Sequence, residues 1–138
     1  AHRIAFGVFA HGLLAEDLDE HTVFRPDDWR QQSLTTGDAA TSGNALFAGD
    51  AYLRHLGVAH GLRTLAAARG LSLGTFVLAT SLAIGNADRY LIGCRSVSEL
   101  HESLAAIDQE LSEAELDAAE QVLAGDPRAG HATGPVEA

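Results

Sequence analysis

The sequence predicts an α/β fold that is rich in helix and contains about two parallel strands. Two short apolar segments, residues 4–10 and 89–94, have the length and the flanking residues typical of strands. Helical sequence with capping residues follows each of them, which is the order of βα units. The chain has 138 residues, the length of one domain, and its 46 % hydrophobic residues allow a sizeable core.

The first half of the chain predicts a strand, a long loop and a helix. Residues 4–10 lie between Arg3 and the pair His11-Gly12, and we expect a buried strand there, with a short helix or turn over 13–18. Residues 19–50 are polar and mixed and predict a long loop with short helical pieces. Loops of that length in compact domains are usually functional lids or disordered.

A helix over residues 51–69 follows, because its apolar residues recur on one face: Val58, Leu62, Leu65 and Ala66. Gly70 is expected to end it in the left-handed conformation. Ser72 then caps a second helix over residues 73–84.

Two sequences with the form of a capping box follow the second predicted strand. Ser96 with Glu99 predicts a helix to about residue 107, and Ser112 with Glu115 predicts another to about residue 123. We therefore expect one domain over residues 1–123. Residues 124–138, rich in Gly, Pro and Ala, predict a flexible tail.

Composition excludes several classes of function. The net charge is −10, so nucleic acid and anionic membranes are poor partners. All nine basic residues are arginine, so a Schiff-base lysine mechanism is excluded for this chain alone. The single cysteine excludes an internal disulfide. No membrane-span-length apolar run and no signal-peptide pattern occur, so we expect a cytoplasmic location, and the residue bias suggests a bacterial source.

Two segments could carry chemistry. Gly93, Cys94 and Arg95 precede a capped helix, and the helix N-terminus together with a guanidinium makes an anion site. The alternative is an ordinary capped helix beside an exposed arginine. At the end of the first strand, glycines 7 and 12 allow close approach of a ligand, and Phe6 or Phe9 could stack on a planar ring. The alternative there is a core strand whose glycines serve packing.

Other candidates are weaker. None of the seven histidines has HExxH or HxxxH spacing, so no metal site is predicted. His11 is a candidate general acid or base because it follows a strand end. Cys94 has no sequence partner for a nucleophilic role, and a buried thiol is its usual state. The acidic residues 16–20 are read most simply as a solvated loop, with a catalytic carboxylate pair as the alternative.

Taken together, five segments resemble the C-terminal part of the aldo-keto reductases, the last two βα units of a (β/α)8 barrel. Residues 7–14 (Gly-Val-Phe-Ala-His-Gly-Leu-Leu) are similar to the loop after the seventh strand, and residues 28–30 (Asp-Trp-Arg) to a following D-[FW]-R. Residues 66–79 are similar to an A-x-x-x-G-x-[ST] segment and the helix after it. Residues 91–104 resemble the segment after the eighth strand, and residues 111–116 the closing L-S-x-E-E-L.

The resemblance implies a partial (β/α)8 barrel and a bound NADP(H), with no metal. Carried over by position, Phe6 would stack on nicotinamide, whereas four residues would line the pyrophosphate: Gly7, Phe9, Gly12 and Leu13. Six residues would surround the adenosine 2′-phosphate and adenine: Gly93, Cys94, Arg95, Glu99, Glu102 and Ser103. Val8 and Ile92 replace prolines of the family pattern, Glu99 stands for Gln or Arg, and Ser103 stands for Asn.

The family's catalytic Asp, Tyr, Lys and His have no counterpart in this chain. We therefore expect a chain that carries the NADP(H)-binding part of a carbonyl reductase and is inactive alone. Its expected partners are a small-molecule ligand and either a second copy or a complementary chain, because two parallel strands cannot close a barrel. The alternative is a repurposed small-molecule-binding or acid–base enzyme on a dimeric remnant of the fold.

Overall fold

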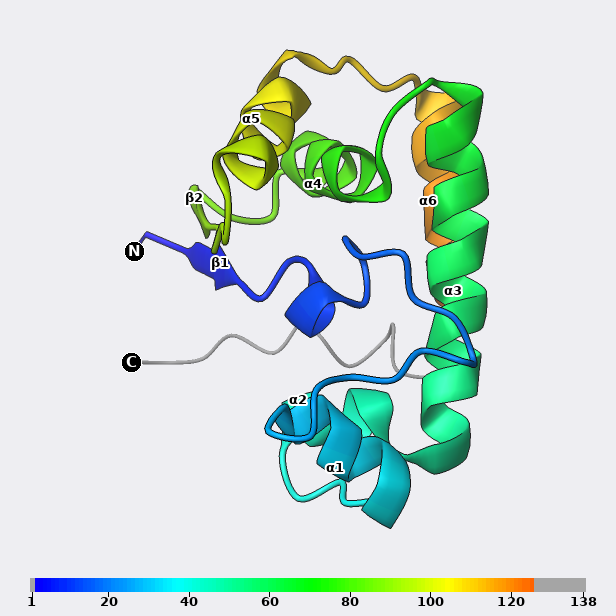
Figure 1. The fold of residues 1–138 in the computed structure, drawn as a ribbon. Coiled ribbons are helices and arrows are strands. Elements are labelled where there is room, and N and C mark those ends of the chain that lie inside the picture. The colour runs from blue at the N-terminus through cyan, green and yellow to red at the C-terminus, as the bar shows by residue number, and fades with distance from the viewer. Residues whose placement is uncertain (1, 126–138) are drawn as a thin grey trace.

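Two long helices that lie side by side form one flank of the molecule (Figure 1). The structure is a computed structural model and describes residues 2–125. Helix α3 (Gly49–Ala68) packs along α6 (Glu113–Ala124), and α4 (Leu73–Ile84) leaves the end of α3 at an angle of 91°. This right-angled pair places one face of α4 against the α3–α6 flank and leaves its other side to the strands and α5.

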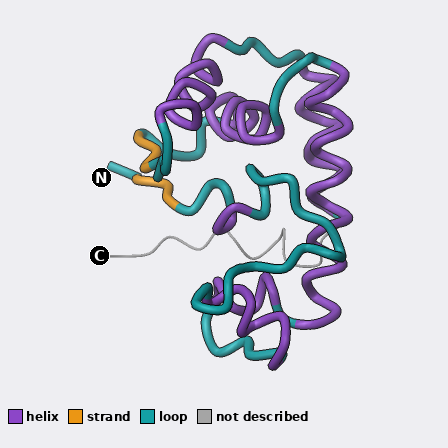
Figure 2. Tube along the Cα trace, in the orientation of Figure 1, coloured by secondary structure: helices purple, strands orange, loops and turns teal. Residues whose placement is uncertain are grey.

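The two strands pair in parallel. β1 (Ile4–Phe6) lies beside β2 (Arg89–Leu91), with Ile4 opposite Arg89 and Phe6 opposite Leu91. The strand starts are fastened by a backbone N–H of Arg3 that donates to Asp88 Oδ2 at 2.6 Å. Helices make up most of the remaining chain (Figure 2). The predicted helix-rich α/β class with two parallel strands is confirmed.

Both strands are shorter than predicted, and the first is not buried. β1 ends at Phe6 because Gly7 takes φ +69° and begins a turn, after which the chain enters a 3-10 turn, η1 (Ala10–Gly12). Ile4 is 52 % exposed and Phe6 is 79 % exposed. The prediction of a buried strand is therefore wrong: within residues 2–125 the sheet has only two strands, and no layer covers these side chains.

The predicted long loop contains two short helices, as expected. α1 (Trp29–Thr36) is capped by the Asp28 carboxylate, which accepts from the Arg30 N–H, and α2 (Ser42–Phe47) follows. Both lie at the end of α3 that is far from α4 (Figure 1). Helix α3 begins at Gly49, two residues before the predicted start.

Most predicted helix ends are confirmed. Gly70 has φ +67°, the Ser72 side chain accepts from the Thr75 N–H, and Ser112 with Glu115 forms a complete capping box. α5 (Val97–Ala105) continues into a second 3-10 turn, η2 (Ala106–Asp108).

The predicted box at Ser96 is only half formed. Ser96 accepts from the Glu99 N–H, but the Glu99 carboxylate turns away to the backbone N–H of Arg95. This diverted carboxylate places a negative charge beside Arg95, which matters for the site described below.

The core has three parts. The largest joins α3, α4 and α6 and is centred on Phe76, Leu62 and Ala119, which are 0 to 3 % exposed. The second packs Phe47 and Tyr52 against Leu13 and Phe24 from the segment before α1. The third holds α4 against η2 through Leu78 and Ala106. The predicted apolar face of α3 is confirmed, because Leu62 and Ala66 are buried in the first part.

The structure also bears on the predicted absence of a membrane-spanning helix and on the predicted C-terminal tail. In the part of the chain that the structure describes, no single helix is both long and apolar enough to cross a membrane; only α3 and α4 counted together, across their bend, reach that length and apolarity. The predicted flexible tail, residues 124–138, lies outside the described residues except for Ala124, which ends α6, and Gly125.

Candidate functional site

The loops that follow the two strands meet on one pocket. Because β1 and β2 are parallel and in register, their carboxyl ends lie at the same edge, where ligands bind in α/β folds. An open pocket of about 840 Å³ lies there, within the range of small-molecule sites. Residues of both loops line it, together with side chains from the segment that starts α1.

Most of the residues predicted from sequence to hold the cofactor line this pocket. Nine of the eleven do so, and they are Gly7, Phe9, Gly12, Gly93, Cys94, Arg95, Glu99, Glu102 and Ser103. The other two do not. Leu13 is 3 % exposed in the core beneath the loop, and Phe6 projects from β1 outside the lining residues. Cys94 is an exposed free thiol, so the prediction of a buried thiol is wrong.

The loop after β1 holds an unusual backbone. Ala10 and His11 have φ +47° and +57°, between Gly7 at +69° and Gly12 at +93°. A non-glycine residue in this region costs of the order of 1 kcal/mol and persists only where its surroundings hold it. Here the Gly7 carbonyl accepts from the Ala10 N–H at 2.9 Å, and the His11 carbonyl accepts from Arg30 Nη1 at 3.1 Å. Of these two strained residues, His11 lines the pocket.

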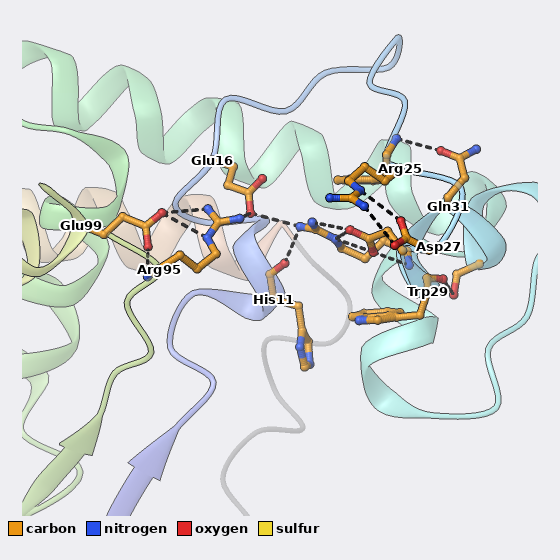
Figure 3. A network of polar contacts seen from close by, with 12 residues as sticks. His11, Glu16, Arg25, Asp27, Trp29, Gln31, Arg95 and Glu99 are labelled. Atoms are coloured by element: carbon orange, nitrogen blue, oxygen red, sulfur yellow. Dashed lines mark hydrogen bonds and ion pairs between the residues drawn. The ribbon is translucent and has the colours of Figure 1, made fainter. Parts of the chain in front are cut away.

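A chain of alternating charges crosses the pocket (Figure 3). Glu99 accepts from Arg95 through Nε and Nη2 at 3.1 and 2.9 Å. Glu16 Oε1 lies 3.1 Å from Arg95 Nη1 and 3.1 Å from Arg30 Nη1. Arg30 also holds Asp28, with Nη2 at 2.8 Å from Oδ2. Two guanidiniums and three carboxylates thus link the loop after β2 to the start of α1.

Arg30 is the anchor of this network. Its side chain is only 14 % exposed and lies over the ring of Phe24, with the guanidinium carbon 4.2 Å from the ring centroid. Bidentate pairing to Asp28 exploits the planar fork of arginine. The hydrogen bond to Asp28 raises the pKa of Arg30, and the same bond lowers the pKa of Asp28.

At the other end of the network, Arg95 and Glu99 stabilise each other's charged forms. The hydrogen bond to Glu99 raises the pKa of Arg95. The hydrogen bond from the Arg95 backbone N–H lowers the pKa of Glu99 most, and the hydrogen bond from the Arg95 guanidinium lowers it further. Both groups are therefore ionised at neutral pH. In the predicted anion site, the Arg95 guanidinium is therefore already bound by two carboxylates of the chain itself, those of Glu99 and Glu16.

Sequence reasoning missed Glu16. The acidic residues 16–20 were expected to form a solvated loop, and for Asp17, whose side chain is 94 % exposed, that holds. Glu16 instead is 24 % exposed and joins both arginines. Gly12 carries no side chain, and this leaves room for the Glu16 carboxylate.

His11, the candidate acid or base, lines the pocket and is exposed. Its ring lies edge-on to Trp29, with centroids 5.2 Å apart. Among residues 2–125, no three His, Cys, Asp or Glu side chains gather as a metal ion would require.

The charge of the pocket limits what it can bind. Its lining contains five acidic residues (Glu16, Asp17, Asp28, Glu99 and Glu102) and two basic ones (Arg30 and Arg95). The size, the glycine loops and the aromatic rings fit a dinucleotide. The resemblance puts the 2′-phosphate of NADP(H) beside Arg95. A phosphate fits this position less well, because the carboxylates of Glu99 and Glu16 lie there.

Comparison with known proteins bears on the fold. No family model matches the chain, and no curated protein matches it. Among solved structures, it is similar to the glycerol dehydrogenase AKR11B4 from Gluconobacter oxydans, with a TM-score of 0.68 and 23 % identity. The chain has the fold of part of an aldo-keto reductase. The similarity covers 97 % of this chain and 36 % of that one, so the predicted partial (β/α)8-barrel fold is confirmed.

Proposed function

We propose that this chain forms the nicotinamide-dinucleotide cradle of a carbonyl reductase of the aldo-keto reductase type, with NADP(H) as the cofactor implied by the resemblance. The observation that carries the proposal is the convergence of the loops after β1 and β2 on one pocket. Gly7 and Gly93, which line the pocket and have nothing within 4 Å of an added Cβ, would let the dinucleotide approach the backbone, and Phe9 offers an apolar face. When bound, the nicotinamide would supply hydride chemistry.

The chain's own residues do not supply a proton donor of the tyrosine or lysine type. It has no lysine and two tyrosines. The Tyr52 hydroxyl donates to the Asp19 carbonyl at 3.0 Å, and the Tyr90 hydroxyl donates to the Ser81 carbonyl at 2.7 Å. Neither tyrosine lines the pocket. A tyrosine or lysine donor for carbonyl reduction is therefore expected from outside these 138 residues, and His11 is the candidate acid that the chain itself brings to the pocket.

A titration of the chain with NADH and NADPH tests the proposal. Trp29, the single tryptophan, lines the pocket, so binding should quench its emission and transfer energy to the reduced nicotinamide. Gly93→Phe should block binding, because its side chain would enter the pocket. Gly57→Phe, at an exposed glycine of α3 with nothing within 4 Å of an added Cβ, is the matched control. No binding at millimolar nucleotide, or equal binding by Gly93→Phe, would overturn the proposal.

The partner proposed for this chain is the remainder of such a barrel. Four apolar side chains on one face of α5 and its 3-10 extension are 46 to 69 % exposed: Val97, Leu100, Leu104 and Ile107. The matched dehydrogenase is about three times longer than its shared segment. Exposed apolar patches of this kind mark interfaces.

Sedimentation velocity of the isolated chain tests this surface. With the α5 face uncovered, the chain should self-associate as its concentration rises. Leu100→Gln with Leu104→Gln should abolish that association, whereas Leu53→Gln, at an exposed leucine of α3, should not. A wild-type chain that stays monomeric at high concentration would contradict the assignment of this α5 face as an exposed interface.

A further inference from the structure

Arg95, the cation best placed to hold a phosphate in the pocket, is already paired with two carboxylates of the chain. Glu99 accepts from its backbone N–H at 2.6 Å, from Nε at 3.1 Å and from Nη2 at 2.9 Å. The remaining nitrogen, Nη1, lies 3.1 Å from Glu16 Oε1. A phosphate at this guanidinium would therefore compete with two carboxylates, one of which binds it through charge-assisted hydrogen bonds.

The fold holds both carboxylates in place. Glu99 is in the first turn of α5, where it leaves the capping box at Ser96 incomplete in order to reach Arg95. Glu16 is gripped from the opposite side by Arg30, which is 14 % exposed and itself fixed by Asp28. These side chains are part of a connected network, so displacing either one breaks several contacts.

The two forms of the cofactor differ at the ribose 2′ position, which the resemblance to the family puts beside Arg95 and Glu99. NADP(H) carries a 2′-phosphate, whose charge would enter a pocket lined by five acidic and two basic side chains. NAD(H) carries a 2′-hydroxyl, which can donate a hydrogen bond to a carboxylate. An acidic side chain at the ribose is the usual device for reading that hydroxyl, whereas an unengaged arginine is the device for the phosphate.

We infer that Glu99, backed by Glu16, makes this pocket select the dinucleotide with a free 2′-hydroxyl, NAD(H), over NADP(H). This inference rests on the proposed function, since it names the form of cofactor that the same pocket takes. Glu99 acts in two ways: it neutralises Arg95 and it offers its own oxygen to the ribose. The resemblance by itself implies the opposite preference, so the inference depends on contacts particular to this chain.

The test compares the two dissociation constants in wild type and in two variants, with Trp29 emission as the readout. Wild type should bind NADH at least tenfold more tightly than NADPH. Glu99→Gln keeps the side-chain size but removes the charge, and it should change that ratio at least tenfold in favour of NADPH. Glu113→Gln removes one charge from the first turn of α6, away from the pocket, and should leave the ratio unchanged. Circular dichroism establishes that each variant is folded.

The outcomes separate the two proposals. Binding of both nucleotides with NADPH equal or tighter, or an unchanged ratio in folded Glu99→Gln, overturns the specificity inference and leaves the dinucleotide cradle intact. No binding of either nucleotide overturns the proposed function and the inference with it.

Discussion

Glu16 places its carboxylate over Gly12, in the space that a methyl group at position 12 would occupy. Gly12 also has φ +93°, which side chains rarely adopt. Two independent requirements for glycine therefore coincide at one position of the loop after β1. The network that joins Arg30 to Arg95 depends on this small residue.

Gly12→Ala should consequently cost more stability than Gly7→Ala. Gly7 has φ +69°, but nothing lies within 4 Å of an added Cβ, so alanine there meets only backbone strain of about 1 kcal/mol. At Gly12 the methyl group also forces the Glu16 carboxylate away from Arg30, and losing this charged contact costs about 1–3 kcal/mol more. Urea unfolding midpoints measure both. Equal losses would show that Glu16 does not need the space.

Arg30→Lys should destabilise the chain by about 1–3 kcal/mol, because a lysine cannot keep the forked contacts to Asp28 and the stacking on Phe24. Arg25→Lys is the control. Arg25 pairs with Asp27 in solvent, with its side chain 84 % exposed, and exposed pairs contribute little. Thermal unfolding followed by circular dichroism compares the two. A loss at Arg30 no larger than that at Arg25 would contradict the role of Arg30 as anchor.

The sequence predicted those parts of the fold that depend on local signals. Helix ends at Gly70, Ser72 and Ser112 follow from backbone conformation and capping, which act within a few residues. The predicted lengths of both strands and the predicted burial of the first strand were wrong. A short apolar segment does not show where its strand ends or which neighbouring elements cover it.

The contacts of Glu16 and Glu99 escaped prediction for a related reason. The capping-box pattern predicts that the Glu99 carboxylate accepts from the backbone N–H of Ser96, but it accepts from the backbone N–H of Arg95. Glu16 contacts an arginine 79 positions later in the chain, and no spacing rule reaches that far. Glu16 and Arg95 come together because the two parallel strands bring the loops that follow them to the same edge of the sheet.

Acid should destabilise the chain partly through Glu115. The Ser112 N–H and hydroxyl, with Arg69, lower the pKa of Glu115 to about 2 from an ordinary 4.5. A lowered pKa in the folded state means that the stabilisation is present above pH 4.5 and is lost as pH falls toward 2. Glu115→Gln should flatten the pH dependence of the unfolding free energy over this window.

Glu113→Gln, in the same first turn of α6, is the control for that measurement. It should keep the slope of wild type between pH 4.5 and 2. If both variants flatten the slope to the same degree, general charge reduction explains the effect and the capping box does not.

Gly61 allows α6 to pack closely on α3, because a Cβ at this position would lie 2.8 Å from Val122 Cγ1. Gly61→Ala gains helix propensity of about 1 kcal/mol but meets a stiff side chain, and overpacking costs about 1–3 kcal/mol. We expect a net loss of stability in the wild-type background and a gain in the Val122→Ala background. Gly57→Ala, with open space around it, should stabilise in both. A double-mutant cycle of unfolding free energies measures the coupling, and coupling near zero would mean that the two helices move apart freely at this contact.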